Sequence, residues 1–238
     1  WLTKNFGPEY EKLGSPIPQD SPDKRELRAT LFRVLGYYGK DPRVLADAKQ
    51  LAEKYINDPA SVEPTMGQTA LSIAARNGDA ELFDKLQHVY ETSHKPDLQD
   101  TALRLLAYFE NPDLAEKAMD YAISGKVRSQ DAAIQLAIEL SIPATRNQAW
   151  KFIQDHWDAI HALLTPELGS ALVGSTGSFC SEQARDDVHQ FFSTHKVASA
   201  EQAVRHSLER INGCIEFRNL QQANLKKWLE SQGTATGI

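Results

Sequence analysis

The chain has 238 residues, of which 41% are hydrophobic and 24% are charged, and its formal net charge is -6 at pH 7. This length and apolar content suffice for a sizeable core, whereas the negative charge argues against nucleic acid or an acidic membrane surface as the main partner. No apolar run approaches the ~20 residues of a membrane-spanning helix, and no signal-peptide pattern is visible near the first residue.

A proline recurs just inside the start of one amphipathic segment after another. These residues are Pro22, Pro42, Pro64, Pro96, Pro112, Pro143 and Pro166. Proline suits the first position of a helix, because the N–H that it lacks would have no partner there. Ser21, Asp41 and Asn111 precede three of these prolines, and their side-chain oxygens can accept hydrogen bonds from the first turn. The pattern predicts many short helices in succession.

Apolar residues recur in steps of three and four, as at Leu27 and Leu31, which is typical of amphipathic helices. Gly39, Gly78 and Gly125 fall just past expected helix ends, where a left-handed residue is favoured. No alternating run of Val, Ile and Thr predicts a strand. Helices are expected over residues 2–13, 22–38, 42–57, 64–77, 79–92, 96–109, 112–124, 129–141, 143–164, 166–174, 181–194, 199–214 and 215–231.

Helix starts recur roughly every 15–23 residues, so that helix pairs take about 32–42 residues, as in helical-repeat proteins. The period drifts, and the tetratricopeptide and ankyrin signatures are missing. The sequence therefore predicts an all-α fold, an irregular HEAT/armadillo-like α-superhelix of stacked antiparallel helix pairs with a concave face. We expect residues 1–21 to form a first helix and connector, and residues 22–238 to form a single α-solenoid domain.

Catalytic and cofactor motifs are missing: the sequence has no HExxH, Walker A, G-x-S-x-G or G-x-G-x-x-G pattern. His156 and His161 are five residues apart, about 140° around a helix, and cannot share a metal on one face. Asp186 and Asp187 are expected on a solvated face in the first turn of a helix. The Gly- and Ser-rich segment 169–177 predicts either a mobile loop or a close backbone contact. We expect no catalytic residue and no metal ligand.

Cys180 and Cys214 show neither a CxxC spacing nor a zinc-ligand spacing. Two free, buried thiols in a reducing compartment are the favoured interpretation, and a disulfide between them is the alternative.

Large apolar side chains repeat along single faces of several expected helices. In the segment 143–164 they are Trp150, Ile153, Trp157, Ile160 and Leu164. The later helices contribute Val188, Phe191 and Phe192, and then Leu225, Trp228 and Leu229. Stripes at this spacing favour a core position, with a binding surface as the alternative.

A set of segments together resembles one known family. They are Val127–Asp131, Arg146–Trp157, Phe179, Phe191-Phe192, Ser199–Glu201 and Leu208–Ile211. The family is the C-terminal helical domain of M1-type zinc aminopeptidases (the ERAP1-like C-terminal domain), and the likeness is greatest to its puromycin-sensitive members. Leu13-Gly14 fits a Leu-Gly near the family's domain start, although Ser15 stands where an aromatic residue often follows.

The resemblance implies that the chain is the C-terminal fragment of a larger multidomain enzyme. In that family a separate catalytic domain carries the zinc ligands and the glutamate that grips the substrate amino group. Neither HExxH nor the family's Gly-x-Met-Glu-Asn motif occurs here. We therefore expect no cofactor in this fragment, zinc in the absent catalytic domain, and no peptide cleavage by the fragment alone.

The resemblance also implies a function, because the family's helical domain caps the active-site chamber and tunes peptide access and length selection. The implied partners are the catalytic domain of its own chain and peptide substrates, with no nucleic acid and no membrane. The resemblance and the unpaired-looking cysteines suggest a cytoplasmic location. The alternative function is a free-standing helical-repeat module for protein–protein interaction.

Four polar residues of the matching segments are candidates for facing the substrate chamber: Arg128, Gln130, Asp131 and Arg146. Arginine suits a peptide carboxylate, because its guanidinium donates two parallel hydrogen bonds. The alternative for these residues is structural, namely helix capping and ion pairing between helices, with Asp131 and Ser129 as caps.

Overall fold

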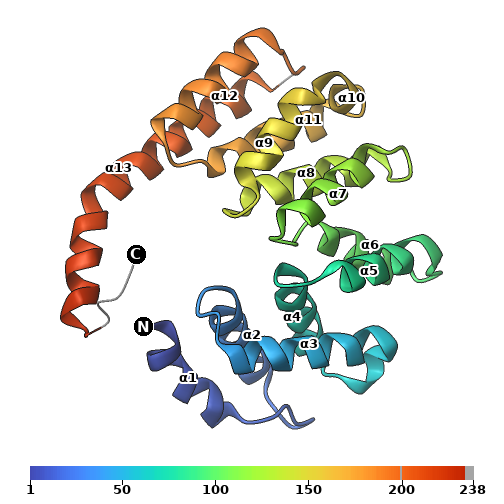
Figure 1. The fold of residues 1–238 in the computed structure, drawn as a ribbon, viewed down its shortest axis with the longest axis vertical. Helices are drawn as coiled ribbons and strands as arrows, with labels where there is room; N and C mark the ends of the chain where they lie inside the picture. Colours follow the sequence, from blue (N-terminus) through green and yellow to red (C-terminus); the bar gives the residue numbers. More distant parts are fainter. Residues whose placement is uncertain (199, 234–238) are drawn as a thin grey trace. The chain divides into compact units, whose positions relative to one another are not determined.

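The computed structural model describes residues 1–198 and 200–233, which form α-helices joined by short turns and contain no β-strand (Figure 1). This confirms the prediction of an all-α fold. In chain order the helices are α1 (Leu2–Leu13), α2 (Pro22–Tyr37), α3 (Pro42–Asn57), α4 (Pro64–Arg76), α5 (Ala80–Thr92), α6 (Pro96–Leu106), α7 (Pro112–Ile123), α8 (Ser129–Ser141), α9 (Arg146–Asp155), α10 (Trp157–His161), α11 (Pro166–Ser175), α12 (Glu182–Thr194) and α13 (Glu201–Ser231), with 3-10 turns η1 (Pro59–Ser61) and η2 (Thr176–Ser178).

The prolines mark helix starts as the sequence predicts. They lie in the first turn of α2, α3, α4, α6, α7 and α11. Ser21, Asp41 and Asn111 each accept hydrogen bonds from N–H groups of the following turn, and Glu63 and Thr165 do the same for α4 and α11. Local capping chemistry therefore sets most helix starts.

Pro143 is the exception, because the helix expected over 143–164 is two helices and begins only at Arg146. The break falls at His156, which separates α9 from α10. The Nδ1 atom of His156 lies 3.0 Å from the carbonyl oxygen of Phe152, and the two rings stack with centroids 4.1 Å apart. These contacts with the preceding turn hold His156 in a turn conformation.

The last two expected helices are one continuous helix, α13. Gly213 lies inside it, next to the boundary that the prediction placed between residues 214 and 215. Ile211 and Ile215 on either side are only 0% and 8% exposed. Their burial on one face favours the helical backbone through the glycine, although glycine costs about 1 kcal/mol relative to alanine inside a helix.

Two of the three glycines expected in left-handed conformation do not adopt it. Gly125 has a φ of 82°, whereas Gly39 and Gly78 have no positive φ, and Lys40 has a φ of 46° near the end of α2. A Cβ atom on Gly39 would lie 2.8 Å from the carbonyl oxygen of Leu35. Glycine at position 39 therefore permits a close backbone approach.

The chain packs as two compact units, Trp1–Lys85 and Leu86–Ile238, and the boundary falls within α5. The domain boundary expected after residue 21 stays a prediction, as do the superhelical curvature and the concave face. In the first unit the core includes Phe32, Leu35 and Ile73, at 0%, 1% and 0% exposure.

A buried arginine holds the connector that follows α1. Arg28 of α2 is 1% exposed; its Nε donates to the carbonyl of Gly14 at 2.9 Å, and one terminal nitrogen lies 3.1 Å from the carbonyl oxygen of Leu13. The same terminal nitrogen lies 2.7 Å from a carboxylate oxygen of Asp20. Arg28 therefore holds the end of α1 and the connector in place through the same side chain.

The second unit has an aromatic core, which confirms the core prediction for its two main stripes. Trp150 and Trp157 each lie 5.2 Å, centroid to centroid, from the ring of Phe191, in edge-to-face geometry. Trp150 also donates from its indole N–H to Asp187 of α12, at 2.5 Å. Asp187 is exposed as expected, and its hydrogen bond with Trp150 connects α12 to α9.

The core prediction is wrong for the end of α13. Leu225 is 56% exposed and Trp228 is 44% exposed. Amphipathic spacing shows which residues share a helix face, but it does not show how deeply that face is buried.

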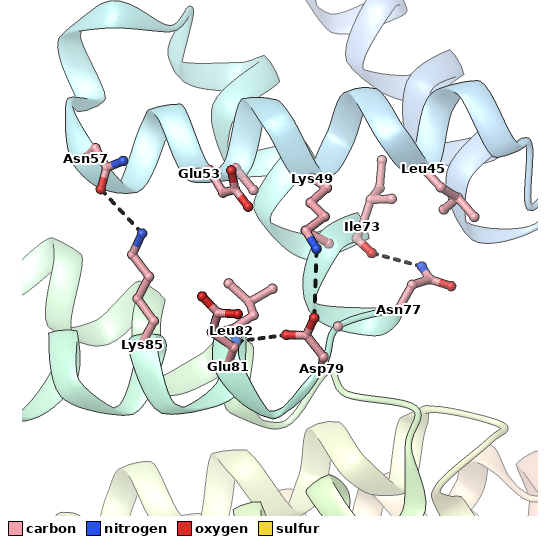
Figure 2. A pocket seen from close by; sticks show the side chains of 13 residues that line it. Leu45, Lys49, Glu53, Asn57, Ile73, Asn77, Asp79, Glu81, Leu82 and Lys85 are labelled. Atoms are coloured by element: carbon pink, nitrogen blue, oxygen red, sulfur yellow. Dashed lines mark hydrogen bonds and ion pairs between the residues drawn. The ribbon is translucent and has the colours of Figure 1, made fainter.

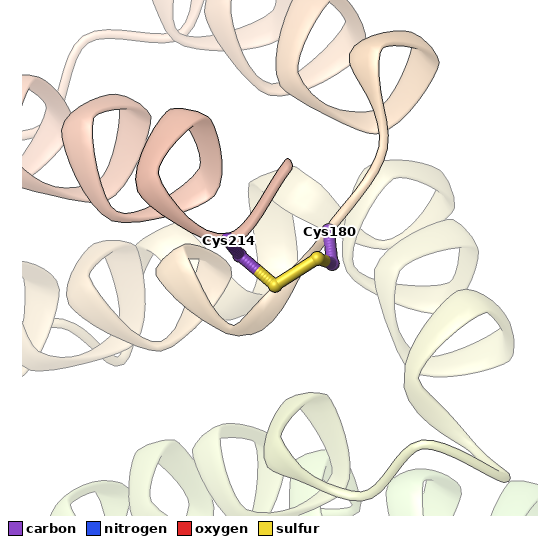
Figure 3. Close-up of a disulfide and its surroundings, with 2 residues drawn as sticks. All are labelled: Cys180 and Cys214. Atoms are coloured by element: carbon purple, nitrogen blue, oxygen red, sulfur yellow. A yellow bond between two sulfur atoms is a disulfide. The ribbon is translucent and has the colours of Figure 1, made fainter. Parts of the chain in front are cut away.

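The favoured prediction of two free, buried thiols is also wrong, because Cys180 and Cys214 form a disulfide (Figure 3). Their Cα atoms are 5.3 Å apart, within the usual range for a disulfide, and the bridge spans a sequence separation of 34. Both residues are partly exposed. Sequence spacing could not show the pairing, because the tertiary fold alone brings the turn before α12 against α13.

Candidate functional site

Two adjoining cavities lie between α8 and α11 in the second unit, and together we call them the α8–α11 groove. The first cavity, of about 490 Å³, is lined by Arg128, Ser129, Gln130, Thr165, Glu167 and Leu168. The second, of about 210 Å³, is lined by Ala133, Ile134, Ala137, Ile138, Ser141, Leu168 and Ala171. Leu168 belongs to both, so the groove passes from a polar end to an apolar floor along α8.

Small residues bring the two helices of the groove close together. Ala133 and Ala137 of α8 lie one turn apart and line the second cavity together with Leu168 and Ala171 of α11. The Ser178 hydroxyl, just after α11, donates to the carbonyl of Leu140 at 2.6 Å. The helices therefore run in the same direction, with both N-termini at the polar end.

The Gly- and Ser-rich segment 169–177 is helical, so of its two interpretations the close backbone contact is correct. A Cβ atom on Gly169 would lie 2.5 Å from a methyl carbon of Val197. A Cβ atom on Gly177 would lie 3.3 Å from the side chain of Arg210. These glycines let α11 and η2 pack closely.

Arg128 and Gln130, two of the four predicted chamber residues, line the polar end of the groove. Arg128 is the residue before α8, and its side chain is 72% exposed. Its Nε donates to Asp131 at 2.8 Å. The guanidinium thus lies at the rim with most of its surface open to solvent.

Asp131, the third predicted residue, lies beneath the rim and does not line the groove. Its side chain is 8% exposed and pairs with Arg128. Burial raises the pKa of Tyr90, and the Asp131 carboxylate adds to this rise. Asp131 therefore positions Arg128 and does not act as a cap.

Arg146, the fourth predicted residue, lies at the far end of α8. Its Nε donates to the carbonyl of Leu140 at 2.9 Å, and a terminal nitrogen donates to that of Ser141 at 3.1 Å. Its guanidinium carbon lies 5.9 Å from the ring centre of Phe179, and burial lowers its pKa. These contacts match the capping alternative, since a cation at a helix C-terminus satisfies the last carbonyls.

A buried polar row on α8 accompanies the groove and was not predicted from the sequence. Gln135 and Glu139 follow Asp131 at four-residue steps and are 2% and 1% exposed. Gln135 donates to the carbonyl of Leu103, but its own carbonyl oxygen and both carboxyl oxygens of Glu139 lack a hydrogen-bond partner. Burial raises the pKa of Glu139 well above its usual value. The nearby Thr145 hydroxyl donates to the backbone carbonyl of Glu139 and not to its carboxyl group.

A third cavity, of about 520 Å³, lies in the first unit between α3 and the start of α5 (Figure 2). Ile73, Leu45 and Leu82 contribute apolar lining, while Lys49 lies 3.8 Å from Asp79 across the rim. The rim carries charges of both signs and favours neither a cation nor an anion. The cavity was not predicted from the sequence, because its lining residues come from three separate segments and none of these segments carries a recognisable binding motif.

Residues 1–198 and 200–233 contain neither a metal-binding cluster nor a membrane-spanning helix. No three His, Cys, Asp or Glu side chains come together as a metal site. No helix of that part of the chain is long and apolar enough to cross a membrane.

Comparison with known proteins shows one family. Residues 1–213 match the model of the ERAP1-like C-terminal domain. Aminopeptidase 2 of Candida albicans is 25% identical over 222 residues, covering 89% of this chain and 23% of that protein. Aminopeptidase 2, mitochondrial, of Saccharomyces cerevisiae is 26% identical over 244 residues, covering 98% and 24%.

A plant relative agrees with the two fungal ones. Aminopeptidase M1-D of Oryza sativa subsp. japonica is 23% identical over 214 residues, covering 86% of this chain and 24% of that protein. The chain thus spans about a quarter of the length of the curated relatives that it matches.

Proposed function

The chain belongs to the ERAP1-like C-terminal domain family, and from this premise we propose that it is the non-catalytic C-terminal domain of an M1 zinc metallo-aminopeptidase. The domain caps the active-site chamber and tunes peptide access and length selection, while the parent enzyme removes the N-terminal residue. Its partners are the catalytic domain of its own chain and peptide substrates. We place the zinc in that catalytic domain, as the relationship to M1 aminopeptidases implies.

The α8–α11 groove is the observation that carries this proposal. Its apolar floor suits side chains of an extended peptide, and the open face of Arg128 suits a carboxylate. The 13 residues of α8 correspond to a length of ~20 Å at 1.5 Å per residue. An extended peptide of about six residues spans that length at ~3.3 Å per residue.

Arg128 is better placed than Arg146 to bind such a peptide. The Arg146 guanidinium already donates to two carbonyls of α8 and is half-buried. Arg128 makes a single ion pair, with Asp131, which keeps its side chain at the rim. We therefore assign carboxylate binding to Arg128. Arg146 instead stabilises the C-terminal end of α8, next to Ser141.

The cytoplasmic location proposed from the sequence keeps only one of its two supports. Disulfides are rare in reducing compartments, so the Cys180–Cys214 bond removes the argument from unpaired cysteines. The resemblance to puromycin-sensitive members remains as support. One relative's name contains the word mitochondrial.

The test uses the full-length parent enzyme with Arg128→Ala and Arg146→Ala, and Lys151→Ala as a matched control. Lys151 is an exposed cation on α9 that pairs with Asp155. We expect Arg128→Ala to lower kcat/KM for long peptides about tenfold, because a hydrogen bond to a charged group contributes ~1.5 kcal/mol or more. Turnover of a small aminoacyl dye should not change.

Arg146→Ala should also change peptide-length preference more than dye turnover, and Lys151→Ala should change neither. If dye and long peptides lose activity equally in both arginine variants, or if neither loses any, the chamber role of this groove is wrong. Robust zinc-dependent cleavage of the dye by the 238-residue chain alone would contradict its assignment as a non-catalytic domain.

The free-standing interaction module remains the second candidate, favoured by the large exposed side chains of α13. The reading frame upstream of Trp1 separates the two. A HExxH motif with a downstream glutamate supports the aminopeptidase proposal, and a short upstream region supports the module.

A further inference from the structure

The third cavity, between α3 and the start of α5, has a polar bridge at each end of its opening, and we call it the α3–α5 cavity (Figure 2). At one end, Nζ of Lys49 lies 3.8 Å from a carboxylate oxygen of Asp79. At the other end, Nζ of Lys85 donates to the side-chain oxygen of Asn57 at 3.3 Å. Lys49 and Asn57 belong to α3, so both bridges connect the same two walls.

Two carboxylates lie between these bridges, one on each wall. Glu53 follows Lys49 by one helical turn on α3, and Glu81 precedes Lys85 by one turn on α5. Figure 2 shows both carboxylates turned toward the space between the two helices. No described residue forms a hydrogen bond or an ion pair with either of them. The middle of the opening is therefore negative and open to a cationic group.

Lys85 brings a positive charge to one end of the opening. Its partner Asn57 is a neutral amide, whereas the charge of Lys49 is already met by Asp79. Four residues along α5 separate Lys85 from Glu81, which corresponds to ~6 Å at 1.5 Å per residue. The rim thus offers a negative and a positive position one helical turn apart, and this pattern fits a ligand that carries both charges.

The bottom of the cavity is apolar. Ile73, Ala52 and Ala74 line it and are 0%, 1% and 8% exposed, while Leu45 and Leu82 on the walls are half-buried. The volume of about 520 Å³ lies within the usual range for sites that bind small molecules. An apolar side chain of a ligand gains free energy when it leaves water for such a surface.

We propose that the α3–α5 cavity binds a short zwitterionic peptide, of which an apolar dipeptide is the smallest. The α-ammonium group lies between Glu53 and Glu81, the carboxylate meets Lys85, and the side chains cover Ile73. The two residues of an extended dipeptide span ~6.6 Å at ~3.3 Å per residue, which matches the spacing of one helical turn. The ammonium and carboxylate of a free amino acid are too close together to reach both positions.

This site is independent of the α8–α11 groove and of the function proposed above. All its lining residues lie between Leu45 and Lys85, within the first unit. A failure of the groove to bind peptides would leave the α3–α5 cavity unaffected, and the reverse also holds.

Isothermal titration calorimetry of the 238-residue chain with leucyl-leucine tests which charges of the ligand are needed. The matched ligands are N-acetyl-leucyl-leucine, which lacks the ammonium group, leucyl-leucine amide, which lacks the carboxylate, and free leucine. We expect leucyl-leucine to bind. Each of the other three should bind at least tenfold more weakly, because each loses a charge-assisted contact.

Variants of the chain assign the two charges to residues. Glu53→Gln/Glu81→Gln should weaken the binding of leucyl-leucine about tenfold and leave that of the acetylated peptide unchanged. Lys85→Met should weaken leucyl-leucine to a similar extent and leave the amide unchanged. Lys54→Met, at an exposed position of α3 outside the cavity, and Arg128→Ala, in the groove, are the controls and should each stay within twofold.

Three results would overturn the proposal. The first is an absence of leucyl-leucine binding, or equal affinity for the dipeptide, its capped forms and free leucine, since the paired charges would then play no part. The second is an equal loss of affinity for every ligand in the charge variants. The third is a loss in Arg128→Ala with none in Glu53→Gln/Glu81→Gln, which would place the peptide in the α8–α11 groove.

Discussion

The two units of the molecule bury a carboxyl group in opposite surroundings. In the first unit Asp20 is 6% exposed and meets Lys24, Arg28 and the N–H of Ile17, with both cations within 3 Å of its oxygens. In the second unit Glu139 is 1% exposed, and neither of its carboxyl oxygens has a hydrogen-bond partner. One buried acid is surrounded by donors and the other has none.

This difference sets the charge of each group. The hydrogen bond from Lys24, followed by those from Ile17 and Arg28, holds the pKa of Asp20 well below its usual value of 3.8. Burial raises the pKa of Glu139 well above its usual value of 4.5. Desolvation disfavours a charged form that lacks compensating donors, so Asp20 is ionised in the fold and Glu139 tends to keep its proton.

The two groups give stability opposite dependences on pH. The contribution of Asp20 is present above its unfolded pKa and is lost as the pH falls below it, because the unfolded chain then binds the proton more readily. Glu139 binds its proton more tightly in the fold than in the unfolded chain. The second unit therefore loses stability as the pH rises from about 4.5 towards the raised pKa of Glu139.

The largest expected effect comes from removing the buried cation of the first unit. Arg28→Met keeps much of the side-chain volume but removes one of the two cations at Asp20 and leaves the carbonyls of Leu13 and Gly14 without their donor. We expect a loss of about 3–5 kcal/mol in the free energy of unfolding, as for other broken buried pairs. Urea unfolding at pH 7 measures it.

Arg33→Met, at an exposed position of the same helix, is the control and should change stability by less than about 0.5 kcal/mol. An equal loss in both variants would show that the contacts of Arg28 with the connector are not the cause.

The opposite change is expected in the second unit. Glu139→Gln keeps the shape, removes the titrating proton and brings an N–H donor to the buried row in which the carbonyl oxygen of Gln135 lies unpaired. We expect a gain of about 1–3 kcal/mol at pH 8, the usual penalty of an unsatisfied buried polar group, and almost no gain at pH 4. Urea unfolding of both proteins across this range tests the expectation.

Gln135→Glu is a useful companion, because it places a second buried carboxyl one turn away on the same row and should lower stability at pH 8. A gain from Glu139→Gln that is the same at pH 4 and pH 8 would contradict the view that proton binding is involved.

A smaller effect is expected in the aromatic core. Phe191→Leu keeps an apolar side chain but removes the edge-to-face contacts with Trp150 and Trp157. Aromatic pairs contribute about 0.5–1.5 kcal/mol beyond the burial of apolar surface. We therefore expect the free energy of unfolding, measured by thermal unfolding, to fall by about 1–2 kcal/mol. Phe217→Leu, on the exposed half of α13, should change nothing, and a similar loss there would indicate that this half is covered.

Much of the fold could be predicted, because its signals are local. Pro22 and Pro42 with their caps Ser21 and Asp41 set helix starts through bonds within one turn. The candidate site could be predicted in part: Arg128 and Gln130 line the groove, whereas Arg146 caps α8 and Asp131 pairs beneath the rim. A motif identifies which residues are present, but not the direction in which each side chain points.

The sequence by itself determined the all-α class, the helix starts and the family, because capping, proline geometry and apolar spacing act over a few residues. Tertiary structure decided the continuity of α13 through Gly213, the bond between Cys180 and Cys214, and the unpaired acid at Glu139. Each of these depends on which distant segment covers a given face of a helix. The burial and pairing of these side chains depend on contacts between distant segments, and a local sequence pattern does not show which segments come into contact.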